Sequence, residues 1–209
     1  AVPGQEGDLP CGGRAVATNP DDDMVTEAVD AARRADVAVL FLGLPSATES
    51  EGFDRTDIEL PADQIALLEA VHGANPNTVV VLANGGVVSI EPWKDHAAAI
   101  LEGWLLGQAG GSAIADLLFG ITNPSGRLTE TIPLRLQDNP SYLHFPGSQQ
   151  HVRYGEGLYV GYRYYDSALR EVAYPFGFGP LAAITSCSNP TTFSPSEVTL
   201  ALVMGLNSR

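Results

Sequence analysis

Three stretches of the chain place apolar residues at the spacing of a helix that buries one face. The first follows three aspartates, and negative charge near a helix N-terminus is favourable because of the helix dipole, so a helix is predicted over about 22–34. A second helix is predicted over 61–72, with Leu68 and Val71 on one side. A third, rich in small residues, is predicted over 111–119.

Three short apolar runs, each bounded by turn-forming residues, predict strands. They read DVAVLFLG at 36–43, TVVVLAN at 78–84 and AAILEGW at 98–104. Continuous apolar runs are typical of strands that are buried on both faces. Because these strands alternate with helices, they predict a parallel sheet covered on both faces. Ligands of such sheets bind beyond the carboxyl ends of the strands, so the loops that follow these three strands are candidate sites.

The C-terminal half of the chain has a different character. From Asn123 onward the sequence is rich in Pro, Gly and Tyr, which indicates loops and short strands rather than another helix and strand. Five tyrosines of this part are expected to pack as a half-buried ribbon over the sheet, and a sugar-binding platform is the alternative. They are Tyr154, Tyr159, Tyr162, Tyr164 and Tyr165.

The composition limits the range of partners. With 209 residues, of which 44% are hydrophobic, the chain can bury one sizeable core, so one main domain is expected. The net charge of −14, from 25 acidic and 11 basic residues, would repel phosphate backbones and anionic lipid headgroups. Neither nucleic acid nor a membrane is therefore expected as a partner, and a neutral or cationic ligand fits the charge better.

Targeting, metal and cofactor signals are absent from the sequence. It has no apolar run of the roughly 18 residues that a membrane span needs, and residues 1–10 do not resemble a signal peptide, so the compartment stays open. The four histidines show no metal-type pairing, and 107–111 lack the spacing of a phosphate-binding loop. No metal and no cofactor are expected. Cys11 and Cys187 allow one disulfide, and whether they pair stays open.

The segment ESEGFDR, which follows the first predicted strand, holds the densest group of polar side chains. It combines three carboxylates with an aromatic ring and a guanidinium, from Glu49, Glu51, Phe53, Asp54 and Arg55. Hydrolysis of a glycosidic bond needs one carboxylic acid to protonate the leaving oxygen and a second carboxylate across the sugar. A glutamate beside a glycine in a loop can supply the acid. A solvated acidic loop without a catalytic role is the alternative.

A series of further segments, in a fixed order, resembles the second domain of family 3 glycoside hydrolases over about residues 20–179. The segments are ESEGFDRTDIELP, DQIALLEAV, ANPNTVVVLANGG, ILEGWLLGQAGGSAIADLLFG, NPSGRLTETIP, NPSYLHFPG, RYGEGLYVGYRYYD and YPFGFG. The resemblance implies an α/β sandwich that packs against a (β/α)₈ barrel. Pattern and resemblance together give the fold class α/β, as a three-layer α/β sandwich with a mostly parallel, flavodoxin-like sheet and a loop-rich C-terminal part.

The resemblance also implies roles for individual residues. In β-glucosidases of the family the general acid/base is the Glu before the Gly of an E-G-aromatic-D-R string, and this position is Glu51. Phe53 matches an aromatic residue near the leaving-group subsite, so it is expected to contact substrate. Asp54 and Arg55 match the pair that follows and are expected to support the loop. Glu49 is the rival for the acid/base role, and the adjacent glycine favours Glu51.

The implied reaction is the hydrolysis of terminal β-D-glucosyl residues with retention of configuration. The implied substrate is a β-glucoside or β-linked oligosaccharide, with β-xylosidase or exo-glucanase specificity left open. The nucleophile of the family is an Asp on the barrel, which this sequence lacks, so a barrel in cis or in trans is the expected partner. Two alternatives are a non-catalytic module that binds glycans or docks a barrel, and a domain with hydrolase activity of its own.

Three regions are expected along the chain. Residues 1–20 form an irregular lead or linker, and 21–179 form the family 3 C-terminal α/β domain. Residues 180–209 are expected to be a truncated or irregular tail that resembles the start of a fibronectin-like module, because about 30 residues are too few for a sandwich of seven strands.

Overall fold

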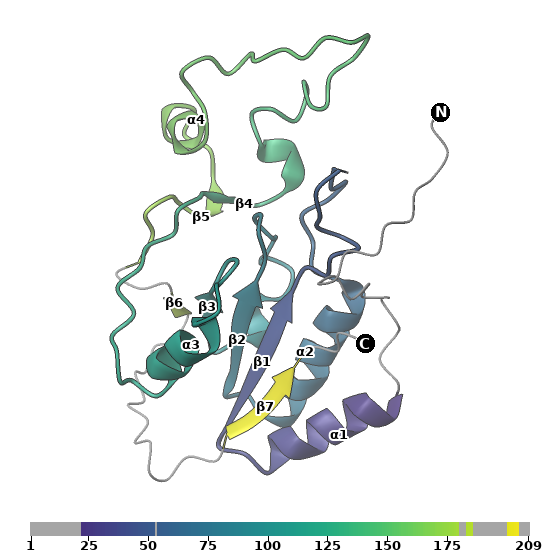
Figure 1. Ribbon diagram of the computed structural model, residues 1–209, viewed down its shortest axis with the longest axis vertical. Coiled ribbons are helices and arrows are strands. Elements are labelled where there is room, and N and C mark those ends of the chain that lie inside the picture. The colour runs from purple at the N-terminus through teal and green to yellow at the C-terminus, as the bar shows by residue number, and fades with distance from the viewer. Residues whose placement is uncertain (1–21, 53, 180–182, 186–199, 205–209) are drawn as a thin grey trace.

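The fold is built on one central sheet, seen in a computed structural model that describes residues 22–52, 54–179, 183–185 and 200–204 (Figure 1). Its strands are β1 (Val37–Gly43), β2 (Thr78–Ala83), β3 (Ala99–Glu102), β6 (Ala183–Thr185) and β7 (Leu200–Met204). They lie in the order β6-β3-β2-β1-β7. β7, β1, β2 and β3 run parallel, and β6 is antiparallel to β3. The predicted mostly parallel sheet is confirmed.

Helices cover both faces of this sheet. α1 (Asp22–Arg33) and α2 (Ala62–Ala74) pack against each other on one face, and α3 (Gly110–Leu118) lies on the other (Figure 1). The three predicted helices are therefore confirmed, with ends that lie within two residues of the predicted ends. The result is the expected three-layer α/β sandwich.

The larger core lies between the sheet and the helices α1 and α2. Successive side chains of a strand point to opposite faces, and Ala38, Leu40 and Leu42 of β1 share this face. They belong to the same buried cluster as Leu68 and Val71 of α2. Each of these five side chains is at most 2% exposed. Burial of this continuous apolar surface holds the helices to the sheet.

A smaller core lies on the opposite face. Val37 and Val39 of β1 form a buried cluster with Val81, and Ile114 and Leu117 of α3 pack against it. Both faces of β1 are thus covered by apolar side chains, which explains why its sequence is a continuous apolar run rather than an alternating one.

The loop-rich part follows α3 and lies beyond the carboxyl ends of β1 and β2 (Figure 1). It contains a two-stranded antiparallel sheet of β4 (Ile132–Pro133) and β5 (Val172–Tyr174). It also contains the short helices η2 (Leu136–Asp138) and α4 (Tyr162–Ser167), while η1 (Lys94–His96) precedes β3. This part borders the same edge of the sheet as the candidate loops after β1 and β2.

The predicted ribbon of half-buried tyrosines is wrong for most of its members. Tyr165 is buried at 6% exposure, but Tyr154 and Tyr159 are 86% and 56% exposed and Tyr162 is 40% exposed. The segment that carries them extends away from the sheet, so the described residues offer little surface to cover the rings (Figure 1).

The predicted lead and tail fall largely outside the described residues, as do Cys11 and Cys187. Within the tail, the two described segments are the edge strands β6 and β7. β7 pairs with β1 in a register that runs from Val37 opposite Leu200 to Phe41 opposite Met204. The division of the chain into three regions stays a prediction. In the described part of the chain, no helix is long and apolar enough to cross a membrane.

Gly43 ends β1 where two strands and a helix meet closely. Its N–H donates to Gln64 Oε1 and its carbonyl accepts from Gln64 Nε2, each over 2.9 Å. A Cβ atom at this position would overlap the carbonyl oxygen of Ala83 on β2. The Gly43→Ala variant is therefore expected to lose about 1–3 kcal/mol of unfolding free energy, as overpacked sites do.

Gly73 of α2 supplies the matched control, because a Cβ atom there would meet no atom within 4 Å. The Gly73→Ala variant is expected to gain about 0.5–1 kcal/mol through the better helix propensity of alanine. Urea unfolding of both variants measures the difference. Equal effects of the two substitutions would contradict the close packing at Gly43.

Candidate functional site

The loop after β1 is tied to the loop after β2 by one carboxylate. Glu49 accepts a hydrogen bond from the N–H of Gly85 at Oε2 and another from the N–H of Gly86 at Oε1, each over 2.6 Å. Hydrogen bonds to an ionised acceptor are shorter and stronger than neutral ones. A Cβ atom at Gly85 would lie 3.1 Å from Glu49 Oε2, which is closer than most side chains approach, so glycine favours this contact.

Arg55 strengthens the same junction from the other end of the segment. Its Nη1 donates to the carbonyl of Val87 over 3.1 Å and lies 3.8 Å from Glu49 Oε1. The two side chains are only 17% and 22% exposed, so water screens their attraction less than at an open surface. The Nε and Nη2 atoms of Arg55 are buried without a hydrogen-bond partner among the described residues.

The residues between these two anchors are placed differently. Glu51 is exposed, and its carboxylate makes no hydrogen bond or ion pair with any residue that the structure describes. Gly52 has a φ of 96°, a conformation that favours glycine and turns the chain here. Asp54 is exposed as well, and Phe53 lies outside the described residues. The structure therefore brings Glu49 and Arg55 together and leaves Glu51 and Asp54 facing solvent.

Two buried polar residues at the ends of β2 and β3 complete the junction. Asn84 is fully buried and donates from Nδ2 to the carbonyl of Gly86 over 2.9 Å. Glu102 is 5% exposed and accepts a hydrogen bond at Oε1 from the N–H of Trp104 over 2.9 Å. Trp104 has a φ of 52°, which is uncommon for a residue with a side chain, so the predicted strand over 98–104 ends at Glu102.

The electrostatic state of Glu102 is set by its burial. Desolvation raises its pKa from 4.5 to about 7, although hydrogen bonds from the Trp104 N–H and the Asn84 side chain act in the opposite direction. The nearby charge of Glu130 raises the pKa further. Glu102 is thus a carboxyl that changes its charge near neutral pH. It was not singled out from the sequence, although a glutamate inside a predicted buried strand is a signal that could have found it.

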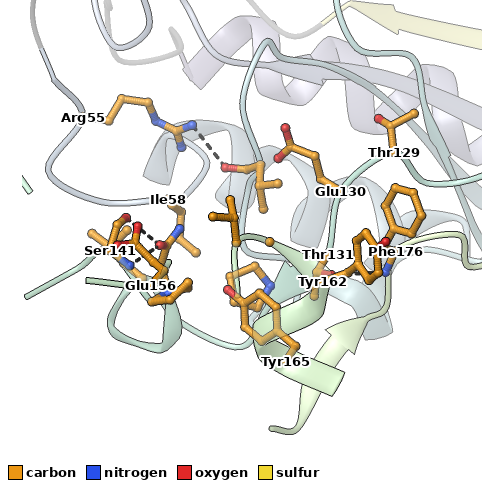
Figure 2. Close-up of a pocket in the computed structure, with 17 residues that line it drawn as sticks. Arg55, Ile58, Thr129, Glu130, Thr131, Ser141, Glu156, Tyr162, Tyr165 and Phe176 are labelled. Atoms are coloured by element: carbon orange, nitrogen blue, oxygen red, sulfur yellow. Dashed lines mark hydrogen bonds between the residues drawn. The ribbon is translucent and has the colours of Figure 1, made fainter. Parts of the chain in front are cut away.

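A cavity of about 510 Å³ lies beside Arg55, under the loop-rich part (Figure 2). Tyr162 and Phe176 border it, and their rings stack with centroids 4.7 Å apart. Glu130 and Glu156 supply carboxylates: burial raises the pKa of Glu130, and one oxygen of Glu156 is buried without a partner in the described part. An aromatic stack beside carboxylates is suited to a polar ligand with an apolar face, such as a sugar.

Metal binding has no support in the described ranges, which contain no group of three His, Cys, Asp or Glu side chains arranged to hold an ion. The chemistry available at the sheet edge is that of carboxylates, one guanidinium and backbone amides.

Residues 8–162 match the sequence model of the glycosyl hydrolase family 3 C-terminal domain, which is more than half of the chain. The chain belongs to glycosyl hydrolase family 3. Its fold is shared with the family 3 β-glucosidase of Bifidobacterium adolescentis at 55% identity and a TM-score of 0.76, over 79% of this chain and 24% of that one. The resemblance and the fold class predicted from sequence are confirmed.

Relatives of this family 3 domain carry different activities in their names. An exo-α-(1→6)-L-arabinopyranosidase of Bifidobacterium longum is 56% identical over 76% of this chain and 21% of its own length. A thermostable β-glucosidase B of Acetivibrio thermocellus is 54% identical over the same shares. The chain thus spans about a fifth of the length of these relatives. The roles of Glu51, Phe53, Asp54 and Arg55 remain predictions.

Removal of the Glu49 carboxylate should free the junction between the two loops. In the Glu49→Ala variant, hydrogen exchange at the amides of Gly85 and Gly86 is expected to speed up by at least about tenfold, since a hydrogen bond to a charged group is worth about 1.5–3 kcal/mol. Glu51→Ala is the control, because that carboxylate contacts neither amide. Equal exchange rates in the two variants, measured by NMR, would argue against the anchoring role of Glu49.

The raised pKa of Glu102 should make stability depend on pH. The folded state holds the proton up to a pH of about 7, and the unfolded state only up to about 4.5. The stabilisation is therefore complete below pH 4.5 and is lost as the pH rises from 4.5 to about 7. The loss should be roughly 3 kcal/mol at most. The variant Glu102→Gln has no such proton. Urea unfolding from pH 5 to pH 8 should therefore show the wild type losing stability relative to the variant, and a constant difference would refute the shift.

Proposed function

We propose that the chain is the acid/base-bearing domain of a retaining β-glucosidase-type enzyme, with Glu51 as the general acid/base. The observation that carries the proposal is the contrast between two glutamates of one loop. The Glu49 carboxylate accepts hydrogen bonds from two backbone amides and lies 3.8 Å from Arg55, so its oxygens are already engaged. Glu51 is exposed beyond the strand ends and is free to meet a substrate. A residue that gives up and regains a proton needs that access.

The proposed reaction follows the two steps of retaining glycosidases. Glu51 gives its proton to the leaving oxygen while a nucleophilic carboxylate bonds to the anomeric carbon. Glu51 then takes a proton from water, which releases the sugar from that carboxylate. The nucleophile belongs to a family 3 barrel domain in cis or in trans, and the two carboxyl groups must lie about 5–5.5 Å apart in the assembled site.

Neighbouring residues have supporting roles in this proposal. Arg55 holds the base of the loop through its bond to Val87 and its approach to Glu49, which fits the expected support. Among the described residues, Asp54 makes no hydrogen bond or ion pair that adds to this support, so its part rests on the resemblance alone. Phe53 is proposed to stack on the leaving group.

The sugar itself is proposed to be recognised mainly by residues of the barrel domain. Two relatives of nearly equal identity to this chain, 56% and 54%, are named for different sugars, arabinopyranose and glucose. A domain that resembles both equally well does not determine which sugar is cleaved. A terminal β-D-glucosyl residue is the proposed substrate because β-glucosidases recur among both the relatives and the solved structures.

A non-catalytic module that docks a barrel or binds glycans is the second candidate. Exposed apolar side chains in the loop-rich part favour it, because a surface of this kind is typical of a docking face. They include Leu143, Phe145, Tyr154, Leu158 and Val160. The same docking face is required by the enzyme proposal, so only the role of Glu51 separates the two.

The test joins residues 21–179 to a barrel by exchanging them for the matching segment of the Bifidobacterium adolescentis β-glucosidase. In this chimera Glu51→Gln is expected to lower kcat by about 10²–10⁴-fold for poor leaving groups, and far less for activated aryl glucosides. Azide should restore turnover of the activated substrates by forming a glucosyl azide, because this anion attacks without a general base.

Glu49→Gln is the matched control, since it removes an equal charge two residues away. It is expected to show no rescue by azide. Rescue of Glu49→Gln but not of Glu51→Gln would transfer the acid/base role to Glu49, and indifference of the enzyme to Glu51→Gln would favour the docking module. The 209-residue chain alone should not hydrolyse an aryl β-D-glucoside; turnover that Glu51→Gln abolishes would instead mean that this chain holds both carboxylates.

A further inference from the structure

The cavity beside Arg55 has the size and the lining of a ligand site. Its volume of about 510 Å³ falls within the range of roughly 300–1,000 Å³ that is typical of small-ligand sites. Its walls come from three parts of the chain, which are the base of the loop after β1, the segment 129–141 around β4 and the segment 156–176 around α4. Glu51 is not among the residues that line it, so a ligand in the cavity needs no contribution from Glu51.

The polar side chains of the cavity carry charges of both signs. The Nε and Nη2 atoms of Arg55 are buried without a partner among the described residues, and so is one carboxylate oxygen of Glu156. Glu130 adds a second carboxylate to the lining. Buried polar atoms are nearly always hydrogen-bonded, and bound water or a ligand serves them where no protein group does. Arg55 therefore needs an acceptor and Glu156 needs a donor.

A neutral ligand with several hydroxyl groups meets both of these needs. Each hydroxyl group donates one hydrogen bond and can accept others. An anion would be attracted by Arg55 but repelled by Glu130 and Glu156, and a cation would meet the opposite pattern. The mixed charges of the lining therefore favour an uncharged polyol over either kind of ion.

The stacked rings of Tyr162 and Phe176 supply an apolar wall. Their centroids lie 4.7 Å apart with an angle of 19° between the ring planes, and the two residues remain 40% and 48% exposed. Figure 2 shows them across the cavity from Arg55 and Glu156. An aromatic ring presents a flat apolar face, and the C–H groups on one face of a sugar ring match it. A polyol with a ring fits this lining better than an open-chain polyol.

We propose that this cavity binds one neutral sugar unit, between Arg55 and Glu156 on one side and the rings of Tyr162 and Phe176 on the other. The inference holds whether or not Glu51 is the general acid/base, because Glu51 does not line the cavity. The domain thus contributes sugar recognition of its own, in addition to the recognition proposed for the barrel.

The first test is a titration of the isotope-labelled 209-residue chain with methyl β-D-glucopyranoside, followed by NMR. Saturable shift changes are expected at amides along the cavity, among them those of Thr131, Tyr162 and Phe176. The segment 143–153, which lines a different hollow, should not change. The absence of saturable changes along the cavity would overturn the proposal. This titration uses the wild type only, so it is decisive even where a variant does not fold.

Three further ligands test the arguments from charge and shape. Glycerol has hydroxyl groups but no ring, the ammonium form of D-glucosamine is a cation, and D-glucuronate is an anion. Each is expected to bind at least about fivefold more weakly than the methyl glucoside. Equal or tighter binding of any of the three would overturn the proposal of a neutral sugar site.

Variants of the lining locate the binding. Tyr162→Ala is expected to weaken binding of the methyl glucoside at least about fivefold, because part of the apolar wall is lost. Tyr159→Ala is the matched control, since Tyr159 is an exposed tyrosine of the same segment that does not line the cavity. Unchanged binding in Tyr162→Ala, or equal weakening in both variants, would overturn the proposal.

The variant Glu51→Gln separates this inference from the proposed function. It is expected to bind the methyl glucoside as the wild type does. Loss of binding in Glu51→Gln would mean that the sugar is held at the loop after β1, and this outcome would overturn the cavity site. A failure of the proposed cleavage would instead appear in the kinetics of the chimera and leave the titration unchanged.

Discussion

The carboxylate of Glu49 accepts hydrogen bonds from two successive backbone amides, and this contact joins the loops that follow β1 and β2. Parallel strands bring their carboxyl ends to one edge of the sheet, but they leave the loops there without a ladder of backbone hydrogen bonds. A charged acceptor that takes two donors replaces that ladder at one point. Arg55 and Glu51 belong to the same short loop as Glu49, and Arg55 approaches this junction while Glu51 is exposed.

Most of the fold could be predicted because burial leaves a direct trace in the sequence. β1 and β2 are covered on both faces, so nearly every residue in them is apolar and their limits are easily recognised. The helices show the corresponding spacing, and Asp22 and Asp23 mark the start of α1. The edge strand β6 is only three residues long, and the edge strand β7, although its sequence LALVM is apolar throughout, lies in the tail that was predicted to be irregular. The ribbon of tyrosines failed because aromatic composition does not reveal whether a neighbouring surface exists to cover the rings.

The site shows where sequence reasoning ends. The string ESEGFDR predicts a site in the loop after β1, yet it does not reveal which glutamate turns inward, because that depends on amides supplied 36 and 37 residues later. Asn84 and Glu102 bond to backbone groups only two residues further along the chain, at Gly86 and Trp104. The pairing of β2 with β3 and the burial of both polar side chains are what the sequence does not show. Charged or amide side chains within apolar runs are the only sequence trace of such a network.

The exposed apolar side chains of the loop-rich part have a consequence for the geometry of the reaction. Under the proposed function, the acid is on this domain and the nucleophile on another, so an interface rather than either fold sets the distance between them. Retaining and inverting glycosidases differ in that distance by only a few ångströms, about 5–5.5 Å against 6.5–9.5 Å. The docking face then sets the distance between the two catalytic carboxyl groups. Residues that never touch the sugar would share control over its stereochemical fate.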